Sequence, residues 1–435
     1  MIDQKVKTEI VAAVDNLADE LVRLVVDLVK IPSVNPCYPG EVYEEVLGGE
    51  TKVNEFLKPI MEDMGLKTDL WAVEKGRANL VGVCKGTGGG KSLIFNGHVD
   101  VVPTGPEEEW TIAGPWSGKI IDGKIYGRGA CDMKGGNAAA IIALKALLAA
   151  GYKPKGDVIL EDVVGEEMMN TEAGTGATVE RGYTADGAIV VEPSGTSYPL
   201  GIIPVSPGLL YMRVNIKGKA THVCFRRELV RAGGIGAEAG VNSIDKAMIV
   251  YEALNRLEEE WGQTKSHPLF GSPLQFTIHP GVITGGPNGA FVVSEKSTIE
   301  YAIWHAPQET EEEVKKEIED QIRRYAQTDP WLRENPPTVE WLLWWPPYDI
   351  PVEAPICQAV QAAYESLKGE APRYSGFLAV DDATWLNQAG IPALTIGAGT
   401  GNIYGIHGAN EYIEISELVD AAKLYALAIV EWCGV

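Results

Sequence analysis

The stretch AAAIIALKALLAAGYKPKGDVILEDVV, residues 138–164, indicates the fold class. Its first half, residues 138–150, is almost wholly apolar, which is typical of a helix buried against a sheet. Residues 157–164, DVILEDVV, are then predicted to form a buried strand, because apolar residues outnumber the three acidic ones. A buried helix followed by a buried strand is the alternation that builds an α/β protein.

The same alternation continues on both sides of this stretch. We predict strands at residues 79–83, 92–95, 187–191 and 393–396, and helices at residues 8–30, 354–368 and 417–432. The pattern favours a central, mostly parallel sheet flanked by helices, with loops gathered at the strand ends. Residues 86–92, GTGGGKS, look phosphate-binding but lack that motif's spacing and precede a strand, so we predict a hairpin turn there.

A second pattern begins near Ser206. Residues 209–217 and 297–303 alternate apolar and polar side chains, which is typical of an antiparallel sheet with one covered face. Helices are predicted beside these strands, at residues 243–261 and 309–326. Two strand groups and two helices indicate a small α+β unit inserted into the larger domain.

The length of the chain also favours two domains. At 435 residues the protein exceeds what one hydrophobic core normally serves. The Pro-rich residues 344–347, WWPP, mark the return to the α/β pattern. We therefore predict a larger domain of residues 1–206 and 346–435, interrupted by a smaller domain of residues 207–345.

The charge balance argues against several classes of partner. The chain has 37 basic and 60 acidic residues, and its net charge of −23 repels phosphate backbones, so we expect no nucleic acid. No apolar stretch approaches the roughly 20 residues needed to cross a bilayer, and the first residues form an amphipathic pattern unlike a signal sequence. The six cysteines form no CxxC pair, as expected of free thiols in a reducing compartment. We predict a cytoplasmic protein.

The strongest local signal for chemistry is FNGHVD, residues 95–100, at the end of a predicted strand. His98 and Asp100 are two residues apart and therefore face the same side of an extended chain. A neutral imidazole is a good metal ligand, and a nearby carboxylate can fix its tautomer and orientation. Taken alone, the pair is equally consistent with a histidine and an aspartate bonded only to each other.

Other motifs add four acidic residues and a second histidine. Asp132, in GRGACDMKGG, precedes the apolar helix, where its carboxylate could bridge two cations or simply cap the turn. Glu166 and Glu167 follow a buried strand, and adjacent carboxylates repel there unless cations neutralise them. One of this pair can bind a metal while the other takes a proton from water. Glu192 follows another strand, and His407 lies in a glycine-rich loop.

Together these motifs predict a metal centre. Four of them come at or just after predicted strand ends, where open α/β sheets gather their ligand sites. Two histidines and three carboxylates form a nitrogen and oxygen set that suits zinc, cobalt or manganese.

Over nearly the whole chain, the order of these motifs resembles that of a known family. This is the dinuclear metallopeptidase and deacylase family of aminoacylase, acetylornithine deacetylase, succinyl-diaminopimelate desuccinylase and the glutamate-releasing carboxypeptidases. The resemblance implies an enzyme with two divalent ions per subunit, zinc first among them, and Glu166 as the general base beside the carboxylate Asp100. The ligands implied for one metal are His98, Asp132 and Glu192, and those for the other are Asp132, Glu167 and His407.

The resemblance also implies that the smaller domain is a lid and dimerisation domain. His222, in KGKATH, matches a histidine that helps to stabilise the transition state, often across a dimer, and Asn242 matches a stretch that contacts substrate. The family usually carries an arginine three residues before a proline, where it binds a substrate carboxylate, but here Trp304 stands at that place. Arg226 and Arg231 could take over this role, or they lie on the surface of a lid loop.

These features leave two substrate classes open for a hydrolase that cleaves a C–N bond. The first, favoured by family frequency, is an N-acyl amino acid or short amide. The second is a flat aromatic acid whose amine or amide nitrogen is released by the same activated water. A non-catalytic, ligand-binding homologue is a third reading, disfavoured because the full set of ligands and the base is present. We expect a small-molecule substrate and a homodimer formed through the lid.

Overall fold

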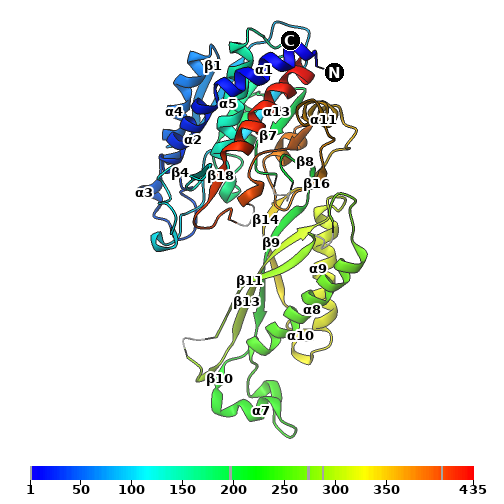
Figure 1. Ribbon diagram of the computed structural model, residues 1–435. Coiled ribbons are helices and arrows are strands. Elements are labelled where there is room, and N and C mark those ends of the chain that lie inside the picture. The colour runs from blue at the N-terminus through cyan, green and yellow to red at the C-terminus, as the bar shows by residue number, and fades with distance from the viewer. Residues whose placement is uncertain (1, 195–197, 272–274, 287–288, 403–404) are drawn as a thin grey trace. The chain divides into compact units, whose positions relative to one another are not determined.

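The computed structural model describes residues 2–194, 198–271, 275–286, 289–402 and 405–435. The chain divides into two compact units (Figure 1). Unit 1 comprises the chain up to Ser206 and from Tyr348 onward, and unit 2 is Pro207–Pro347. We predicted the return at residue 346, whereas the two prolines at 346 and 347 still group with unit 2.

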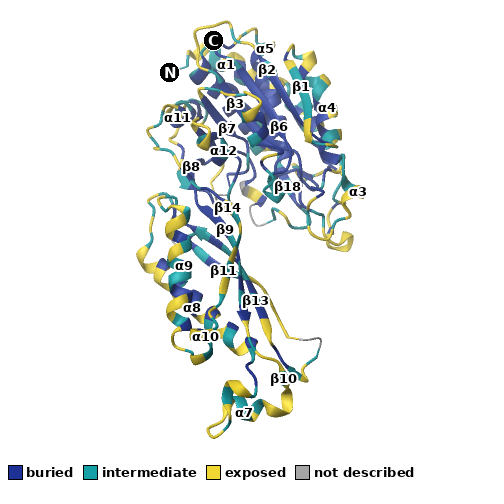
Figure 2. Ribbon diagram, turned by 180° about the vertical axis from the view of Figure 1, so that it is seen from behind, coloured by how far each residue is buried: buried dark blue, intermediate teal, exposed yellow. Residues whose placement is uncertain are grey.

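Unit 1 is built on a nine-stranded sheet in the order β1-β2-β6-β3-β7-β17-β8-β15, with β16 also paired to β8. Its strands are β1 (Lys67–Glu74), β2 (Arg77–Cys84), β3 (Leu93–His98), β6 (Val158–Val163), β7 (Gly187–Val190), β8 (Ile202–Ser206), β15 (Tyr348–Asp349), β16 (Tyr374–Gly376) and β17 (Ala393–Thr395). The middle strands β6, β3, β7 and β17 are parallel, and antiparallel pairs lie toward both edges. The predicted sheet is confirmed, and its strands are largely buried (Figure 2).

Helices cover this sheet. They are α1 (Gln4–Asn16), α2 (Ala18–Val29), α3 (Tyr43–Val46), α4 (Gly49–Asp63), α5 (Lys134–Ala149), α6 (Thr175–Glu180), α11 (Pro355–Lys368), α12 (Ala383–Gln388) and α13 (Ile415–Cys433). The helices predicted at residues 138–150, 354–368 and 417–432 are confirmed as α5, α11 and α13. The apolar helix α5 is buried along almost its whole length and packs against β3, α1, α2 and α13. Because α5 begins just after Asp132, its burial fixes that residue close to the end of β3.

Two local predictions in unit 1 were wrong. The single helix expected over residues 8–30 is divided into α1 and α2 at Leu17. The N–H group of Leu17 donates to the carbonyl oxygens of both Ala13 and Val14. The residue before it, Asn16, is a weak helix former. The hairpin expected at residues 86–92 does not exist, because β6 lies between β2 and β3 in the sheet. Those residues instead connect two strands that are not neighbours.

A small sheet in unit 1 connects two distant parts of the chain. It consists of β4 (Lys119–Ile121), β5 (Lys124–Tyr126) and β18 (Tyr412–Glu414), in the order β18-β5-β4. Tyr412 pairs with Tyr126, which anchors the loop before β18 beside the loop that leads into α5. His407 lies in the first of these loops and Asp132 in the second.

Unit 2 contains a four-stranded antiparallel sheet in the order β11-β13-β9-β14. Its main elements are β9 (Gly208–Lys217), β11 (Thr277–Gly285), β13 (Lys296–His305), β14 (Thr338–Trp345), α8 (Ser243–Thr264) and α9 (Glu311–Ala326). Shorter elements are β10 (Thr221–His222), β12 (Val292–Val293), α7 (Arg226–Val230) and α10 (Pro330–Glu334). Alternate residues of β9 and β13 are buried, and α8 packs against the sheet and α9, so the predicted smaller α+β unit is present.

Candidate metal centre

The sheet of unit 1 brings most of the predicted site residues to one edge. His98 is the last residue of β3, and Glu166 and Glu167 open a short 3-10 helix, η2 (Glu166–Met168), after β6. Glu192 follows β7. Because β6, β3 and β7 are adjacent and parallel, their carboxyl ends lie together, as in other open α/β sheets.

Two imidazoles share the carboxylate of Asp132. The Nε2 atom of His98 lies 3.1 Å from Oδ1 of Asp132, and the Nε2 atom of His407 lies 3.1 Å from Oδ2. His98 Nε2 is also 3.4 Å from Oε2 of Glu192, and His407 Nε2 is 3.1 Å from Oε2 of Glu167. The structure therefore groups these residues into two sets that have Asp132 in common.

Glu166 lies on the His98 side of this cluster. Its Oε2 atom is 3.8 Å from Nε2 of His98, which exceeds a hydrogen bond. No hydrogen bond to the Glu166 side chain is present among the described residues, so its carboxylate is available for a proton. Glu167, the next residue, points to His407 instead. The two adjacent acids thus face different partners.

The buried carboxylates of the cluster would be stabilised by added positive charge. Burial raises the pKa of Glu166, Glu167 and Glu192, because a carboxylate loses solvation there. Burial alone would lower the pKa of His98 and His407, but the neighbouring carboxylates outweigh it. They hold the pKa of His98 well above its usual value and raise that of His407 to about 12. Without a cation, four carboxylates would depend on protons for their neutralisation.

The donor set fits a divalent cation. Ligand atoms of His98, Asp132 and Glu167 lie within 4.8 Å of one another. The buried Oε2 atom of Glu192 accepts no hydrogen bond from the described residues, although it faces His98. A buried acceptor without a donor is costly, and a metal ion would satisfy it. Imidazole nitrogen with carboxylate oxygen suits zinc, cobalt or manganese.

Asp100 is placed differently from our expectation. We expected its carboxylate to orient His98, but the Nδ1 atom of His98 lies 2.8 Å from the main-chain oxygen of Asp100 and 3.7 Å from its carboxylate. The carboxylate instead accepts hydrogen bonds from Asn35 Nδ2 (2.7 Å) and from the N–H groups of Gly165 (2.9 Å) and Glu167 (3.1 Å). Asp100 thus holds the η2 loop, while its carbonyl holds the imidazole.

Gly165 is required by the geometry of that loop. Its φ of 93° lies in the left-handed region, which side chains disfavour. An added Cβ atom would also lie 2.5 Å from the main-chain oxygen of Asn170. Glycine at this position therefore allows the sharp turn that presents Glu166 and Glu167 directly after β6.

Comparison with known proteins settles the family. Residues 94–431 match the model of peptidase family M20/M25/M40. The chain belongs to this family. The family is metal-dependent, so a metal-dependent hydrolase of N-acyl C–N bonds, the class expected from the sequence, is confirmed at the level of the family.

Relatives of known sequence or structure cover nearly the whole chain. The N-formyl-4-amino-5-aminomethyl-2-methylpyrimidine deformylase of Halalkalibacterium halodurans is 36% identical, and the match covers 98% of this chain and 97% of that protein. The succinyl-diaminopimelate desuccinylase of Alkalilimnicola ehrlichii is 26% identical over 77% of this chain and 82% of its own. The solved structure of aminopeptidase PepT from Bacillus cereus matches with a TM-score of 0.70 at 20% identity, covering 96% and 99% of the two chains. That last likeness shows the M20 fold.

The remaining predicted site residues of this M20 protein lie in unit 2. His222 ends β10 and is exposed, and its Nδ1 atom accepts a hydrogen bond from the Cys224 N–H (3.1 Å). Asn242 caps α8 by accepting from the Ile244 N–H (3.1 Å). It also lines a groove of about 310 Å³ with Arg226. Each of these residues has a local structural role that the sequence did not reveal.

The two candidate arginines differ in their surroundings. Arg226 is paired with Asp245, which neutralises its charge within unit 2. Arg231 follows α7 and is exposed. Trp304 is half-buried in β13, where it pairs with Leu209 and lies on the opposite face from the residues that are buried under α8. In the described part of unit 2, the position of the family arginine is therefore filled by an indole.

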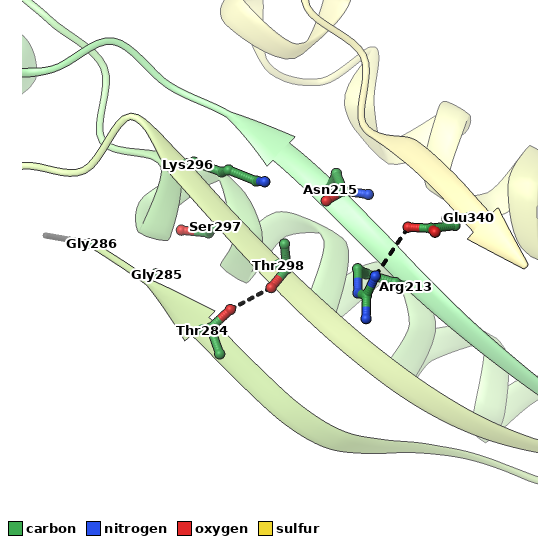
Figure 3. Close-up of a pocket in the computed structure, with 9 residues that line it drawn as sticks. All are labelled: Arg213, Asn215, Thr284, Gly285, Gly286, Lys296, Ser297, Thr298 and Glu340. Carbon is green, nitrogen blue, oxygen red and sulfur yellow. Dashed lines mark hydrogen bonds and ion pairs between the residues drawn. The ribbon is translucent and has the colours of Figure 1, made fainter. Parts of the chain in front are cut away.

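A polar hollow of about 500 Å³ also lies on unit 2 (Figure 3). Arg213 in this hollow is bonded to Glu300 and Glu340, and Thr284 is bonded to Thr298. Arg213 is thus already neutralised, Lys296 is a second cation in the lining, and none of the predicted site residues lines the hollow. We assign it no role in the reaction.

Residues that support the ligands were missed by the sequence reasoning. Asn137 donates to the main-chain oxygen of His98 (2.8 Å) from the first turns of α5. Arg128 and Glu411 form a buried ion pair between the Asp132 and His407 loops. Arg128 and Glu411 both lie in the sequence motifs that contain the predicted ligands. A charged residue so close in sequence to a predicted ligand could have indicated such a supporting role.

Proposed function

We propose that this M20 protein removes an N-acyl group, formyl in particular, from a small heteroaromatic amine by metal-assisted hydrolysis. The observation that carries the proposal is the shared carboxylate of Asp132, which has an imidazole 3.1 Å from each of its oxygens. This arrangement fits two cations that share one carboxylate. Two deformylases that are 36% and 34% identical supply the chemical class.

The proposed ligands follow the two sets in the cluster. His98, Asp132 and Glu192 would hold one divalent ion, and Asp132, Glu167 and His407 the other. Zinc is our first choice, with cobalt or manganese as alternatives. Bound at this place, such ions would polarise the acyl oxygen and lower the pKa of a water molecule toward neutrality.

Glu166 is the proposed general base. Its carboxylate lies beside the ligands without being engaged by them, and desolvation raises its pKa. A carboxylate in this position can accept a proton and return it. Glu166 would take a proton from the attacking water and deliver it to the leaving nitrogen. Asp100 would act as a positioning residue, because it bonds the main chain on both sides of Glu166.

The residues of unit 2 are proposed to act on the acyl group and the rest of the substrate. Following the family resemblance, His222 would stabilise the oxyanion by donating a hydrogen bond. Asn242, Arg226 and Arg231 would contact substrate. The exposure of His222 and Arg231 supports this role, because neither side chain is committed to the core.

Trp304 supports an aromatic substrate without a carboxylate. The two deformylases are named for a formamide on an aminopyrimidine, which has no carboxylate for an arginine to bind. An indole in place of the guanidinium offers an aromatic face instead. We therefore propose the N-acyl cleavage of our first class, on an aromatic carrier in place of an amino acid. Unlike the substrate of our second class, this carrier is not an acid.

Two adjacent substitutions test this assignment. We expect Glu166→Gln to lower kcat by about a hundred- to ten-thousand-fold, since it removes the base, while the protein still binds two metal ions per subunit. The matched control Glu167→Gln should lose metal, as measured by elemental analysis after dialysis. Unchanged turnover in Glu166→Gln, or metal loss from Glu166→Gln alone, would contradict the proposed roles.

A homodimer formed through unit 2 is the proposed assembly. Ile244, Met248 and Tyr251 are spaced along one face of α8, and 37–43% of each residue's surface is exposed. Helix α8 packs beside β11, the end strand of the sheet, which exposes Val282 and Ile283. An end strand beside an apolar helical stripe suits a second copy of the same chain.

We propose a cytoplasmic location. All six cysteines are free thiols in the structure, as in proteins of a reducing compartment. Among the described residues, no helix is both long enough and apolar enough to cross a bilayer.

A further inference from the structure

One buried ion pair lies directly behind the predicted ligands. Arg128 comes from the loop before α5, and Glu411 comes from the loop before β18. The Nη1 atom of Arg128 is 2.5 Å from Oε2 of Glu411, and each side chain is only 1% exposed. The two residues are 283 positions apart in the sequence, so the pair joins distant parts of the chain.

Glu411 controls the main chain at Asp132. Its second carboxylate oxygen, Oε1, accepts hydrogen bonds from the N–H groups of Cys131 (3.0 Å) and Asp132 (3.2 Å). Both oxygens of Glu411 are therefore engaged, one by the guanidinium and one by the backbone of the shared ligand. This fixes where the Asp132 side chain begins.

Arg128 controls the main chain at His407. Its Nη2 atom donates to the carbonyl oxygens of His407 and Pro103, each at 3.2 Å. One planar guanidinium thus connects three loops, in a geometry that an ammonium group cannot reproduce.

The two histidines depend on different supports. His98 is 1% exposed, with its Nδ1 atom bonded to the Asp100 carbonyl and its own carbonyl bonded to Asn137. The side chain of His407 is 52% exposed, and its φ of 64° places it in the left-handed region. Packing therefore holds His98, whereas the direction of His407 depends on its anchored backbone.

We propose that Arg128 and Glu411 form a positioning pair for the Asp132–Glu167–His407 metal site. The bond from Arg128 to the His407 carbonyl sets the metal affinity of that site, so loss of Arg128 has much less effect on the site with His98 and Glu192, whose Asp132 is still held by the side-chain oxygen at position 411. This inference rests on the proposed ligand set. A buried ion pair adds little net stability, so its main contribution is to geometry.

The test measures each metal site separately. In a Glu192→Gln background the site with His407 is the one that remains intact, and in a Glu167→Gln background it is the site with His98. Zinc affinity of the metal-stripped full chain is measured in each background by competition with a chromophoric chelator. Arg128→Lys keeps the positive charge but loses the planar guanidinium with its several N–H donors. We expect it to weaken zinc binding at the His407 site by about 10- to 100-fold. The same change should leave the His98 site nearly unaltered.

A second variant guards against misfolding. Arg128→Met combined with Glu411→Gln leaves no buried charge without a partner, and it should fold and show the same selective loss. Leu147→Ala, in the buried face of α5, is the control for general destabilisation and should keep both affinities. Equal weakening at both sites, or no weakening at the His407 site, would overturn the inference.

Zinc binding by the two background variants, Glu167→Gln and Glu192→Gln, distinguishes failure of this inference from failure of the proposed function. If Glu167→Gln and Glu192→Gln each still bind two zinc ions with unchanged affinity, the ligand set itself is wrong. If each loses one site and Arg128→Lys then has no selective effect, the ligand set stands and the positioning role fails.

Discussion

At the residue scale, the candidate metal centre consists of a few carboxylates and two imidazoles that contact one another. Asp132 contacts both histidines, and Glu166 and Glu167 diverge to different sides although they are adjacent. This divergence fits the roles that we propose, with Glu167 as a metal ligand and Glu166 as the base. The residue types and their order already indicated this set, because imidazole and carboxylate at converging strand ends have few other uses.

The supporting residues could not be derived in the same way. Arg128 and Glu411 are separated by 283 positions, and no spacing rule links them. The expected hydrogen bond between the Asp100 carboxylate and His98 is also absent from the described residues, because the imidazole is bonded to the main-chain oxygen of Asp100 instead. Sequence patterns give the ligands, whereas hydrogen-bond partners depend on loop conformations that the pattern does not encode.

Substitution of Trp304 tests the basis of substrate selection. Trp304→Arg restores the cation that family members use to bind a substrate carboxylate, so we expect it to gain turnover of N-succinyl or N-acetyl amino acids. Turnover of an N-formyl aminopyrimidine should fall, because the indole face is lost. The measurement is kcat/KM for both substrates, with Trp304→Phe as the aromatic control. Loss of both activities in Trp304→Phe and no gain in Trp304→Arg would contradict this view.

His305 makes the stability of unit 2 depend on pH. Burial lowers the pKa of His305 to about 4 from 6.5, and Lys265 adds to the effect. The unfolded chain therefore binds a proton between these values while the folded chain does not. Stability is fully present above pH 6.5 and is lost as the pH falls toward 4, on the order of 3 kcal/mol in total.

The pH dependence can be measured by urea unfolding between pH 7 and pH 4. His305→Asn removes the titrating group, so its free energy of unfolding should fall less steeply with decreasing pH than that of the wild type. The ring contacts Gly208 across the sheet, where an added Cβ would lie 2.0 Å from Nε2 of His305. Parallel pH profiles for the two proteins would show that His305 does not carry the effect.

At the scale of elements, most of the buried strands of the large sheet follow from the sequence, although the buried strand β8 was missed. The prediction of a strand at residues 157–164 matches β6 to within one residue at each end, although the buried acids Glu161 and Asp162 interrupt its apolar residues. Strands β1 and β11 were missed, since most of their residues are exposed or half-buried and show no clean alternation. These two strands are held in their sheets by hydrogen bonds to one neighbouring strand each, which the sequence pattern does not indicate.

The exposed stripe on α8 gives a prediction about assembly. Met248→Glu places a charge in the middle of the apolar stripe, so we expect a shift from dimer to monomer at micromolar concentration. Gln263→Glu, near the exposed end of the same helix, adds the same charge outside the stripe and serves as the control. Sedimentation velocity would distinguish the two. A wild-type protein that sediments as a monomer would rule out the proposed interface.

At the scale of the whole molecule, the two units divide the work. Unit 1 carries the proposed ligands and base, most of them at the carboxyl ends of parallel strands, and unit 2 carries the residues that we propose to contact substrate. Metal chemistry could be predicted from the sequence because it depends on few residue types at strand ends. The substrate could not, since the positions that we propose for its recognition, such as Trp304 and Arg226, are isolated and form no motif.

The most direct test of the account is release of formate from N-formyl-4-amino-5-aminomethyl-2-methylpyrimidine by the metal-loaded and the chelator-stripped protein. N-succinyl and N-acetyl amino acids serve as the comparison substrates. We predict formate release that requires metal, returns when zinc is added back, and exceeds turnover of the amino acid derivatives. Formate release that persists without metal, or turnover of the amino acid derivatives alone, would contradict the account.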